Sequence, residues 1–392
     1  MVRRMGLAVA AVVVVCVATA GCGSNPLVGV LLPSSGVAAT YGESIESGVR
    51  LALSDARARD AVPTGFEVLW ADTGSDPGRA ADELRRLATE RNVRLVIGGA
   101  TSAEARAMIP ELEELDVVCL SPSASAPGLA QLSRLFYRIY PSDELEGHTA
   151  AKFLLDRLDK STVILYAGNA EYAMGIEPEF QKQFEDGLGG RIETRVDLRD
   201  ADWQSQSVAA LRSPTDPGVY IIGYADEILE VLRHLDGEGF HGRVVTTASF
   251  YSGAAIRKAA ELAEGLLFPL PPFDRTSEKE PVLSFVNRYM ETYQRAPDVF
   301  AAHGYDAMRL AIEVMAIASP PQTQEIRRAL QFGVAEFMGV TGPILFDESG
   351  DVKHYPKMFI IKDGQVLSYQ RYLKAERARI LRQVQDLLVD QG

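Results

Sequence analysis

Short apolar runs alternate with longer segments of helical periodicity from residue 27 to about residue 120. The run Leu27–Leu32 is continuously apolar, which is typical of a strand buried on both faces of a parallel sheet. Apolar residues then recur at helical spacing from Ile45 to Ala56. The same alternation continues with strand-like runs at 66–70, 94–97 and 117–120 and helical segments at 80–87 and 108–115. This order predicts a doubly wound α/β sheet.

The alternation begins again after residue 148, which indicates a second sheet and therefore two lobes. Further strands are expected at 162–166, 192–198, 219–222 and 244–248. Three helical stretches and a hairpin-like end with an Asp363-Gly364 turn follow. The tail, residues 373–392, has amphipathic spacing. We expect it to pack against its own lobe, with binding to a partner as the alternative.

The N-terminus has the parts of a secretory signal peptide, which we assign to residues 1–21. Arg3 and Arg4 precede an apolar run that ends at Ala18, which is shorter than the roughly 20 residues that a membrane span needs. Cys22 follows Ala20-Gly21, an arrangement that resembles the lipobox of bacterial lipoproteins, although Thr19 replaces the usual leucine. The resemblance implies that Cys22 carries lipid and anchors the protein to a membrane of the cell envelope. The alternative is an ordinary signal peptide.

Composition excludes several kinds of partner and chemistry. The formal charge of −13 argues against nucleic acid, because binding to phosphates needs clustered Lys and Arg. The three cysteines and five histidines show no metal-ligand spacing, so no metal and no cofactor is expected. Cys119 lies in an apolar run and is expected to be buried. The chain also lacks a phosphate-binding Gly-Lys-Ser/Thr loop, a Gly-x-Ser-x-Gly elbow and a paired-His helix, which disfavours an enzyme.

Several segments together resemble the Leu/Ile/Val-binding family of type I periplasmic binding proteins; they lie at 28–42, 96–102, 120–127 and 342–350. The resemblance extends from about residue 27 to 366. It implies two α/β lobes joined by three crossovers, with the ligand in the cleft between them. With crossings near Pro141, Pro269 and Gly342, the first lobe comprises 25–141 and 270–341, and the second comprises 142–269 and 342–372.

Ligands of doubly wound sheets bind beyond the carboxyl ends of the strands, where loops lead into helices. Ser102 lies where a helix is expected to begin, so free backbone N–H groups there can hold a carboxylate without an arginine. Alternatively, Ser102 only caps that helix. The resemblance implies two further donors, Ser123 through its backbone and Ser125 through its hydroxyl group.

Four aromatic residues are expected at the cleft. The resemblance implies that Tyr172 and Tyr224 close over the ligand and that Phe300 forms an apolar wall, and Tyr41 lies in the loop after the first strand. Tyr172 and Tyr224 come from the second lobe, and Phe300 and the loop residue Tyr41 come from the first. Aromatic rings supply a large contact area, and tyrosine adds a polar group. The alternative for each is packing within the core.

One position departs from the family pattern. Amino-acid binders place an acidic residue after the strand that ends near Thr247, whereas this chain has Ala248-Ser249-Phe250-Tyr251-Ser252. An unpaired buried ammonium group would cost several kcal/mol. A standard α-amino acid is therefore disfavoured unless Asp226, Glu227 or Glu171 substitutes, and a small carboxylate, amide or other neutral or anionic metabolite is expected.

The resemblance implies that the protein captures this small molecule and delivers it to an ABC permease in the inner membrane. A ligand-sensing or envelope-regulatory lipoprotein with the same fold is the alternative, because a fold alone does not determine function.

Overall fold

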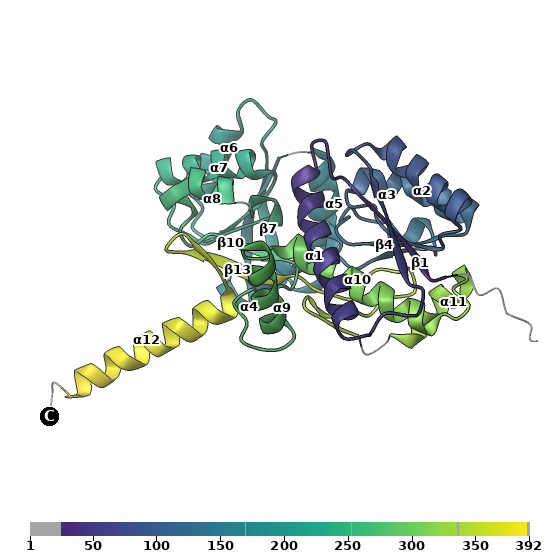
Figure 1. Ribbon diagram of the computed structural model, residues 1–392. Helices are drawn as coiled ribbons and strands as arrows, with labels where there is room; N and C mark the ends of the chain where they lie inside the picture. Colours follow the sequence, from purple (N-terminus) through teal and green to yellow (C-terminus); the bar gives the residue numbers. More distant parts are fainter. Residues whose placement is uncertain (1–24, 169, 252, 335–336, 390–392) are drawn as a thin grey trace, which may run out of the picture.

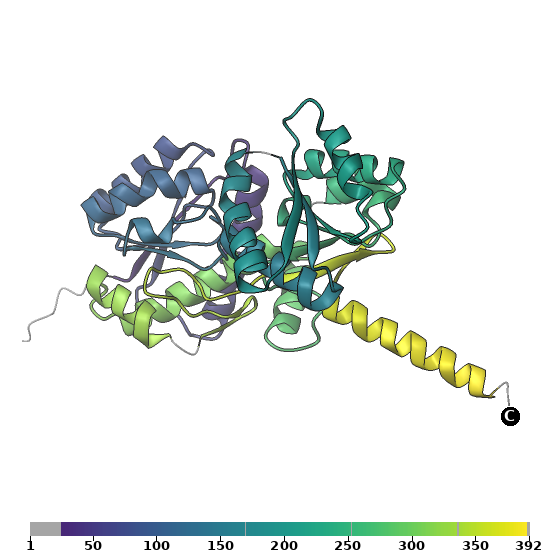
Figure 2. The same ribbon diagram turned by 180° about the vertical axis from the view of Figure 1, so that it is seen from behind.

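Two open sheets, each covered by helices, lie side by side and form two lobes (Figures 1 and 2). The computed structural model describes residues 25–168, 170–251, 253–334 and 337–389. The predicted doubly wound α/β class is confirmed, because both sheets alternate with helices along the chain.

The first sheet has five parallel strands in the order β2-β1-β3-β4-β5. Its strands are β1 (Leu27–Leu32), β2 (Glu67–Asp72), β3 (Leu95–Ile97), β4 (Val118–Ser121) and β5 (Phe136–Arg138). Its helices are α1 (Ala39–Ala58), α2 (Pro77–Arg91), α3 (Ser102–Leu115), α9 (Val282–Tyr293), α10 (Val299–Ile317) and α11 (Thr323–Arg328). β1, β3 and β4 are almost entirely buried, and Cys119 lies within this core as expected.

The second sheet has seven strands in the order β14-β13-β10-β9-β8-β6-β7. Five are parallel: β6 (Thr162–Ala167), β7 (Arg191–Asp197), β8 (Gly218–Ile222), β9 (Val244–Thr246) and β10 (Leu267–Leu270). The predicted terminal hairpin, β13 (Lys357–Lys362) and β14 (Gln365–Ser368), adds antiparallel strands beside β10. The covering helices are α4 (Asp143–Leu158), α5 (Ala170–Gln181), α6 (Trp203–Leu211), α7 (Ala225–Gly237) and α8 (Gly253–Ala259).

The chain passes between the sheets three times, and the third passage differs from the expectation. After the short hairpin β11 (Met338–Gly339) and β12 (Gly342–Pro343), Ile344 and Val352 are buried in the core of the first sheet. A backbone bridge also joins Arg138 to Asp351. The segment 342–352 therefore belongs with the first lobe, and its assignment to the second lobe is wrong. The chain crosses only between Val352 and β13.

The C-terminal helix α12 (Tyr369–Val389) also differs from the expectation, since it projects away from both lobes (Figures 1 and 2). Its first turn is attached to the second lobe: Tyr369 and Tyr372 pack against the core, and the Tyr369 ring meets Phe153 of α4 edge to face with centroids 4.7 Å apart. The prediction that this helix packs back on its lobe is wrong beyond that turn. Across the described ranges, no helix combines the length and hydrophobicity needed to cross a bilayer.

Helices α1 and α10 pack closely enough that two glycines are required at the contact. A Cβ atom on Gly48 would overlap the carbonyl oxygen of Ala301, and one on Gly304 would overlap that of Ile45. Because the opposing atoms belong to helix backbones, they cannot move aside as a flexible side chain would. This contact positions α10, which carries Phe300 toward the other lobe.

We therefore expect Gly48→Ala to lower the free energy of unfolding by about 1–3 kcal/mol, because the added methyl group forces the two helices apart. Gly237→Ala in α7 is the matched control, since a Cβ there meets nothing within 4 Å. The control should leave stability unchanged or raise it by up to about 1 kcal/mol. Urea unfolding measures the free energy of unfolding of both variants. Equal changes in the Gly48 and Gly237 variants would contradict the close packing of α1 and α10.

Candidate functional site

A cavity of about 480 Å³ lies between the lobes, at the carboxyl ends of strands from both sheets. The first lobe contributes side chains from the loops after β3, β4 and β5 and from the ends of α1 and α10. The second contributes α4 and the loops after β8 and β9. The principal lining residues are Tyr41, Thr101, Ser102, Ser123, Ser125, Tyr140, Asp143, Glu146, Tyr224, Ala248, Ser249, Tyr251 and Phe300.

The N-terminus of α3 opens onto this cavity, but Ser102 is not its cap. Thr101 is the N-cap: its hydroxyl accepts the N–H of Glu104, and the Glu104 carboxylate accepts the Thr101 N–H at 3.0 Å. The Ser102 hydroxyl instead accepts the N–H groups of Ser125 at 3.3 Å and Ala126 at 3.1 Å. Ser102 thus holds the loop after β4 beside the helix end, and its own O–H can still be donated toward the cavity.

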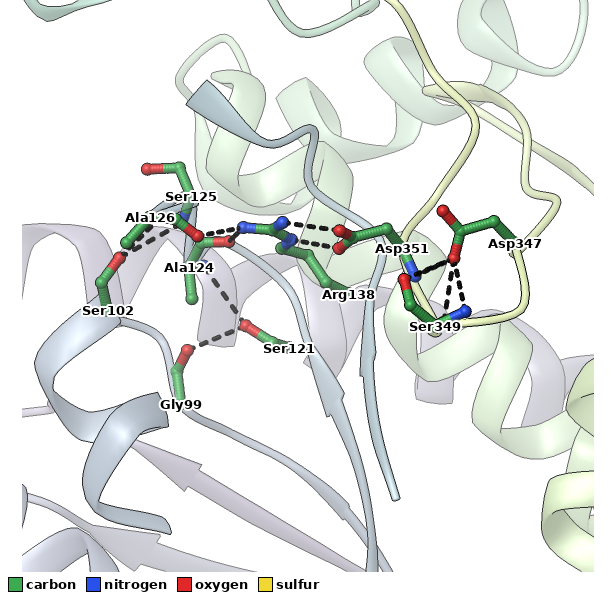
Figure 3. A network of polar contacts seen from close by, with 11 residues as sticks. Gly99, Ser102, Ser121, Ala124, Ser125, Ala126, Arg138, Asp347, Ser349 and Asp351 are labelled. Carbon is green, nitrogen blue, oxygen red and sulfur yellow. Dashed lines mark hydrogen bonds and ion pairs between the residues drawn. The ribbon is translucent and has the colours of Figure 1, made fainter. Parts of the chain in front are cut away.

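The loop after β4 is fixed by hydrogen bonds at its serines, of which Figure 3 shows those of Ser121 and Ser125. The Ser121 hydroxyl donates to the Gly99 carbonyl at 2.9 Å and accepts the Ala124 N–H at 3.2 Å. The Ser123 hydroxyl donates to the Ala100 carbonyl at 2.5 Å. Ser123 therefore has its side chain engaged within the protein, which leaves its backbone as the part that can meet a ligand.

Arg138 at the end of β5 fixes the same loop from the other side (Figure 3). Its guanidinium is fully buried, forms two hydrogen bonds with the Asp351 carboxylate at 2.6 and 2.9 Å, and donates to the Ala126 carbonyl at 2.8 Å. A paired, planar guanidinium satisfies all of these acceptors at once. Arg138 is thus a structural residue that connects the third crossover to the ligand-facing loop.

Aromatic side chains form one wall of the cavity. Phe300 lies between Tyr41, which meets it edge to face at 4.9 Å, and Tyr140, which stacks on it at 6.1 Å. Tyr41 and Tyr224 are each half exposed, on opposite sides of the cavity. The structure therefore brings three of the four predicted aromatic residues to the cavity. The fourth, Tyr172, lies in the first turn of α5, and its side chain falls outside the described residues.

Acidic side chains reach the cavity from the first turn of α4, which begins five residues before the helix expected from residue 148. Glu146 is 5% exposed, and its carboxylate accepts the backbone N–H of Ala248. A carboxylate from α4 therefore lies against the loop after β9, although that loop has no acidic residue of its own. The sequence signal was present: three acidic residues, Asp143, Glu144 and Glu146, begin the helix that directly follows the first crossover.

The three acids that the sequence suggested as substitutes do not supply this carboxylate. Asp226 is exposed and pairs with Lys258 at 2.6 Å, and Glu227 accepts the Tyr224 N–H at 2.7 Å at the start of α7. The side chain of Glu171 falls outside the described residues.

The electrostatic character of the cavity is acidic. Burial raises the pKa of the Asp143 carboxyl to about 7, while its hydrogen bond to Ser125 and the nearby Arg138 oppose that rise. Burial also raises the pKa of Tyr140 well above its ordinary value, and the carboxyls of Asp143 and Glu146 add to the effect. Among the described lining residues there is no Lys, Arg or His. The cavity therefore favours a ligand with a cationic or hydrogen-bond-donating group.

Two parallel-sheet lobes with a small polar cavity at the carboxyl ends of their strands define a small-molecule binding protein of the type I periplasmic binding fold. The family described as "Periplasmic binding protein" matches residues 27–364, and the chain belongs to that family.

Relatives by sequence are solute-binding proteins. The chain is 25% identical over 330 residues to the leucine-, isoleucine-, valine-, threonine-, and alanine-binding protein of Pseudomonas aeruginosa, which covers 82% of this chain and 86% of that protein. It is 23% identical over 325 residues to the Leu/Ile/Val-binding protein of Escherichia coli, with 82% and 86% covered. The predicted resemblance to Leu/Ile/Val-binding proteins is therefore confirmed.

Solved structures agree on the fold. A branched-chain amino acid transporter substrate binding protein from Streptococcus pneumoniae, in complex with isoleucine, superposes with a TM-score of 0.72 at 26% identity, covering 88% of this chain and 98% of that one. A leucine binding protein from Thermotoga maritima gives 0.71 at 27% identity, covering 87% and 97%. The predicted two-lobed fold is confirmed.

The raised pKa of Asp143 predicts a pH dependence of stability. The unfolded chain loses this proton near its ordinary pKa of 3.8, whereas the folded protein keeps it up to about pH 7. The folded state thus binds more protons in this interval, so the stability contributed by this site is full below about pH 4 and falls as the pH rises toward about 7. The Asp143→Asn substitution removes the titrating group. The stability of this variant relative to that of the unaltered protein should therefore increase as the pH rises through that interval. Urea unfolding at several pH values measures the difference, and a constant difference would refute the shift.

Proposed function

We propose that this protein is a lipid-anchored receptor of the bacterial cell envelope that captures a small amino-acid-like metabolite for an ABC importer. The observation that carries the proposal is the placement of Glu146 against Ala248 in the same cavity as the N-terminus of α3. The cavity then has one end suited to a carboxylate and another suited to an ammonium group, which are the two groups that every α-amino acid carries.

The carboxylate end is the start of α3 with the loop after β4. Helix N-termini present free N–H groups and a partial positive charge, so they bind anions without a basic side chain. Ser102 offers a hydroxyl donor there, the backbone of Ser123 lies alongside, and the hydroxyl of Ser125, which is hydrogen-bonded to Asp143, also lines the cavity. These three serines are proposed as ligand-binding residues.

The ammonium end is Glu146, with Asp143 one helical turn before it. A buried carboxylate is costly unless it is paired and hydrogen-bonded. The Glu146 carboxylate accepts the N–H of Ala248 at the edge of the cavity, and a ligand ammonium there would supply the opposite charge. The expectation of a neutral or anionic ligand depended on the missing acid at Ala248 and Ser249. Because α4 supplies that acid, we now favour an α-amino acid.

Aromatic residues would enclose the ligand side chain from both lobes. Tyr41 and Phe300 lie on the first lobe and Tyr224 on the second, and Tyr172 stays a proposed fourth contact. The Pseudomonas relative is named for five aliphatic or small amino acids, whereas a structure from R. palustris with the same fold, at 19% identity and a TM-score of 0.67, contains benzoate. The acids on α4 favour the amino-acid class for this chain.

Transport would follow from closure of the two lobes around the bound molecule and presentation of the closed form to a membrane permease. Residues 1–21 are proposed as the signal peptide and Cys22 as the lipidated residue; both lie outside the described residues. Only three residues separate Cys22 from Pro26, so the first lobe would stay close to the bilayer.

Glu146→Gln should weaken binding of the preferred amino acid by about 30-fold or more, because loss of one partner of a buried charge pair costs about 2 kcal/mol or more. Glutamine keeps the shape of the side chain and one carbonyl oxygen for Ala248. Calorimetry across a panel of α-amino acids, the corresponding carboxylic acids without the amino group, and the corresponding amines identifies the ligand and measures the loss.

The matched control is Glu144→Gln, the same change two residues away on α4 at a position that does not line the cavity. This control should bind as the unaltered protein does. If the carboxylic acids bind as tightly as the amino acids, or if both variants bind normally, Glu146 is not an ammonium partner.

The lipid anchor has its own test. Cys22→Ser should move the protein from the membrane fraction to the soluble fraction and abolish labelling by radioactive fatty acid in the producing cell. Cys119→Ser is the control. Because the Cys119 thiol is buried, this substitution should change neither the membrane fraction nor the labelling. Labelling that persists in the Cys22 variant would exclude this site of lipidation.

A further inference from the structure

Helix α12 projects from the second lobe and carries exposed apolar residues. It leaves the second lobe after Tyr369 and extends into solvent (Figures 1 and 2). Leu373, Ile380 and Leu381 are 42%, 49% and 54% exposed. The ring contact between Tyr369 and Phe153 attaches the base of the helix to α4, so its apolar residues are presented from a fixed point on the lobe.

The charge of α12 is opposite to that of the whole protein. Residues 369–389 contain five basic and two acidic side chains, whereas the chain as a whole has a formal charge of −13. Arg379 pairs with Glu376 on the same helix. Within the described part of the chain, Arg371, Lys374 and Arg377 form no ion pair. Basic side chains without acidic partners are thus concentrated on the segment that projects furthest from an acidic body.

A groove at the base of α12 also combines exposed apolar side chains with basic ones. This groove, of about 720 Å³, lies between α4, β13 and the first turns of α12. Tyr355 and Leu373 contribute exposed apolar surface. The lining also holds three basic side chains and two acidic ones, with Lys152 paired to Asp156 at 3.6 Å; these charged residues are Lys152, Arg157, Lys357, Asp156 and Asp274. Tyr355 is 55% exposed. The groove therefore adds exposed apolar surface and a small excess of basic side chains to those of the helix.

We propose that α12 and the groove at its base bind the surface of an anionic phospholipid bilayer. A helix with basic side chains and exposed aliphatic residues inserts its apolar side chains at the headgroup boundary while its cations meet anionic lipids. The helix cannot span the bilayer, since no helix in the described ranges has the required length and hydrophobicity. It lies on the surface, and long arginine and lysine side chains extend toward the headgroups.

The residue pattern disfavours a second copy of this chain as the occupant. A two-helix seam needs apolar residues at alternating spacings of three and four. With either order of spacings, the seam position between Leu373 and Ile380 is charged, Glu376 or Arg377, although Val384 and Leu387 continue an apolar spacing beyond Ile380. Pairing two such helices would also bring like charges together. A bilayer requires neither a regular seam nor a complementary row of acids.

The test uses the full chain with Cys22→Ser, so that binding does not depend on the proposed lipid anchor. It is mixed with vesicles of phosphatidylglycerol and phosphatidylcholine, or of phosphatidylcholine alone, and bound protein is measured by sedimentation. Binding is expected to the mixed vesicles only and should fall as salt is raised. Each basic residue near an anionic surface contributes roughly fivefold to the partition coefficient, so Arg371→Gln, Lys374→Gln and Arg377→Gln together should lower it by at least about tenfold.

The matched control removes three exposed cations from the first lobe, with Arg86→Gln, Arg91→Gln and Arg106→Gln on α2 and α3. It should bind mixed vesicles as before. Ile380→Ser with Leu381→Ser tests the apolar component and should also weaken binding, while circular dichroism verifies that each variant is folded.

Three outcomes overturn the proposal. One is equal sedimentation with neutral and mixed vesicles, and another is an equal loss in the lobe control and the α12 variant. The third is a concentration-dependent dimer in analytical ultracentrifugation that is lost in the Ile380 and Leu381 variant, which would identify a second copy as the occupant instead.

Discussion

The buried ion pair between Arg138 and Asp351 is the interaction on which the arrangement of the cleft depends. These residues are 213 positions apart in sequence, and their carboxylate and guanidinium groups meet in two hydrogen bonds. Asp351 is itself presented by a tight turn in which one Asp347 oxygen accepts the N–H groups of Ser349, Gly350 and Asp351 (Figure 3). Removal of either member of such a pair would leave an uncompensated buried charge, which is far more costly than the absence of both.

Two consequences follow from this pair. It holds the segment 342–352 against the first sheet, which determines where the chain finally crosses to the second lobe. It also places the guanidinium under the loop after β4, where it donates to the Ala126 carbonyl and keeps that loop beside Ser102. The same residue thus joins the connection between the lobes to the proposed carboxylate end of the site. A buried cation that is already paired contributes little net charge to the cavity, so the carboxyl groups on α4 dominate its electrostatic character.

Much of the fold could be predicted from the sequence because buried parallel strands and their helices have a local signature. Continuous apolar runs such as Leu27–Leu32 and helical periodicity around Ile45 depend on near neighbours alone.

The third crossover and the position of α12 could not be predicted in this way. Gly342 marks a turn, but whether Ile344 and Val352 join one core or the other depends on contacts with residues far away in sequence. Similarly, amphipathic spacing shows that α12 has an apolar side without showing what covers it. In the site, Ser102 and Tyr41 were predicted from the loops that follow the strands and Phe300 from the family resemblance. Glu146 was missed because it reaches the loop after β9 from a different element.

The acidic lining of the cavity bears on how fast a ligand is captured as well as how tightly it is held. Carboxyl groups recessed between low-dielectric walls focus the electric field toward the cavity mouth and raise the local concentration of cations there. The effect decreases with ionic strength because mobile ions screen the field over roughly 8–10 Å at physiological salt. An envelope receptor is exposed directly to the salt of its surroundings. The encounter rate between this cavity and a positively charged group would therefore follow the salinity of the medium, even if the contacts inside the closed cavity remained the same.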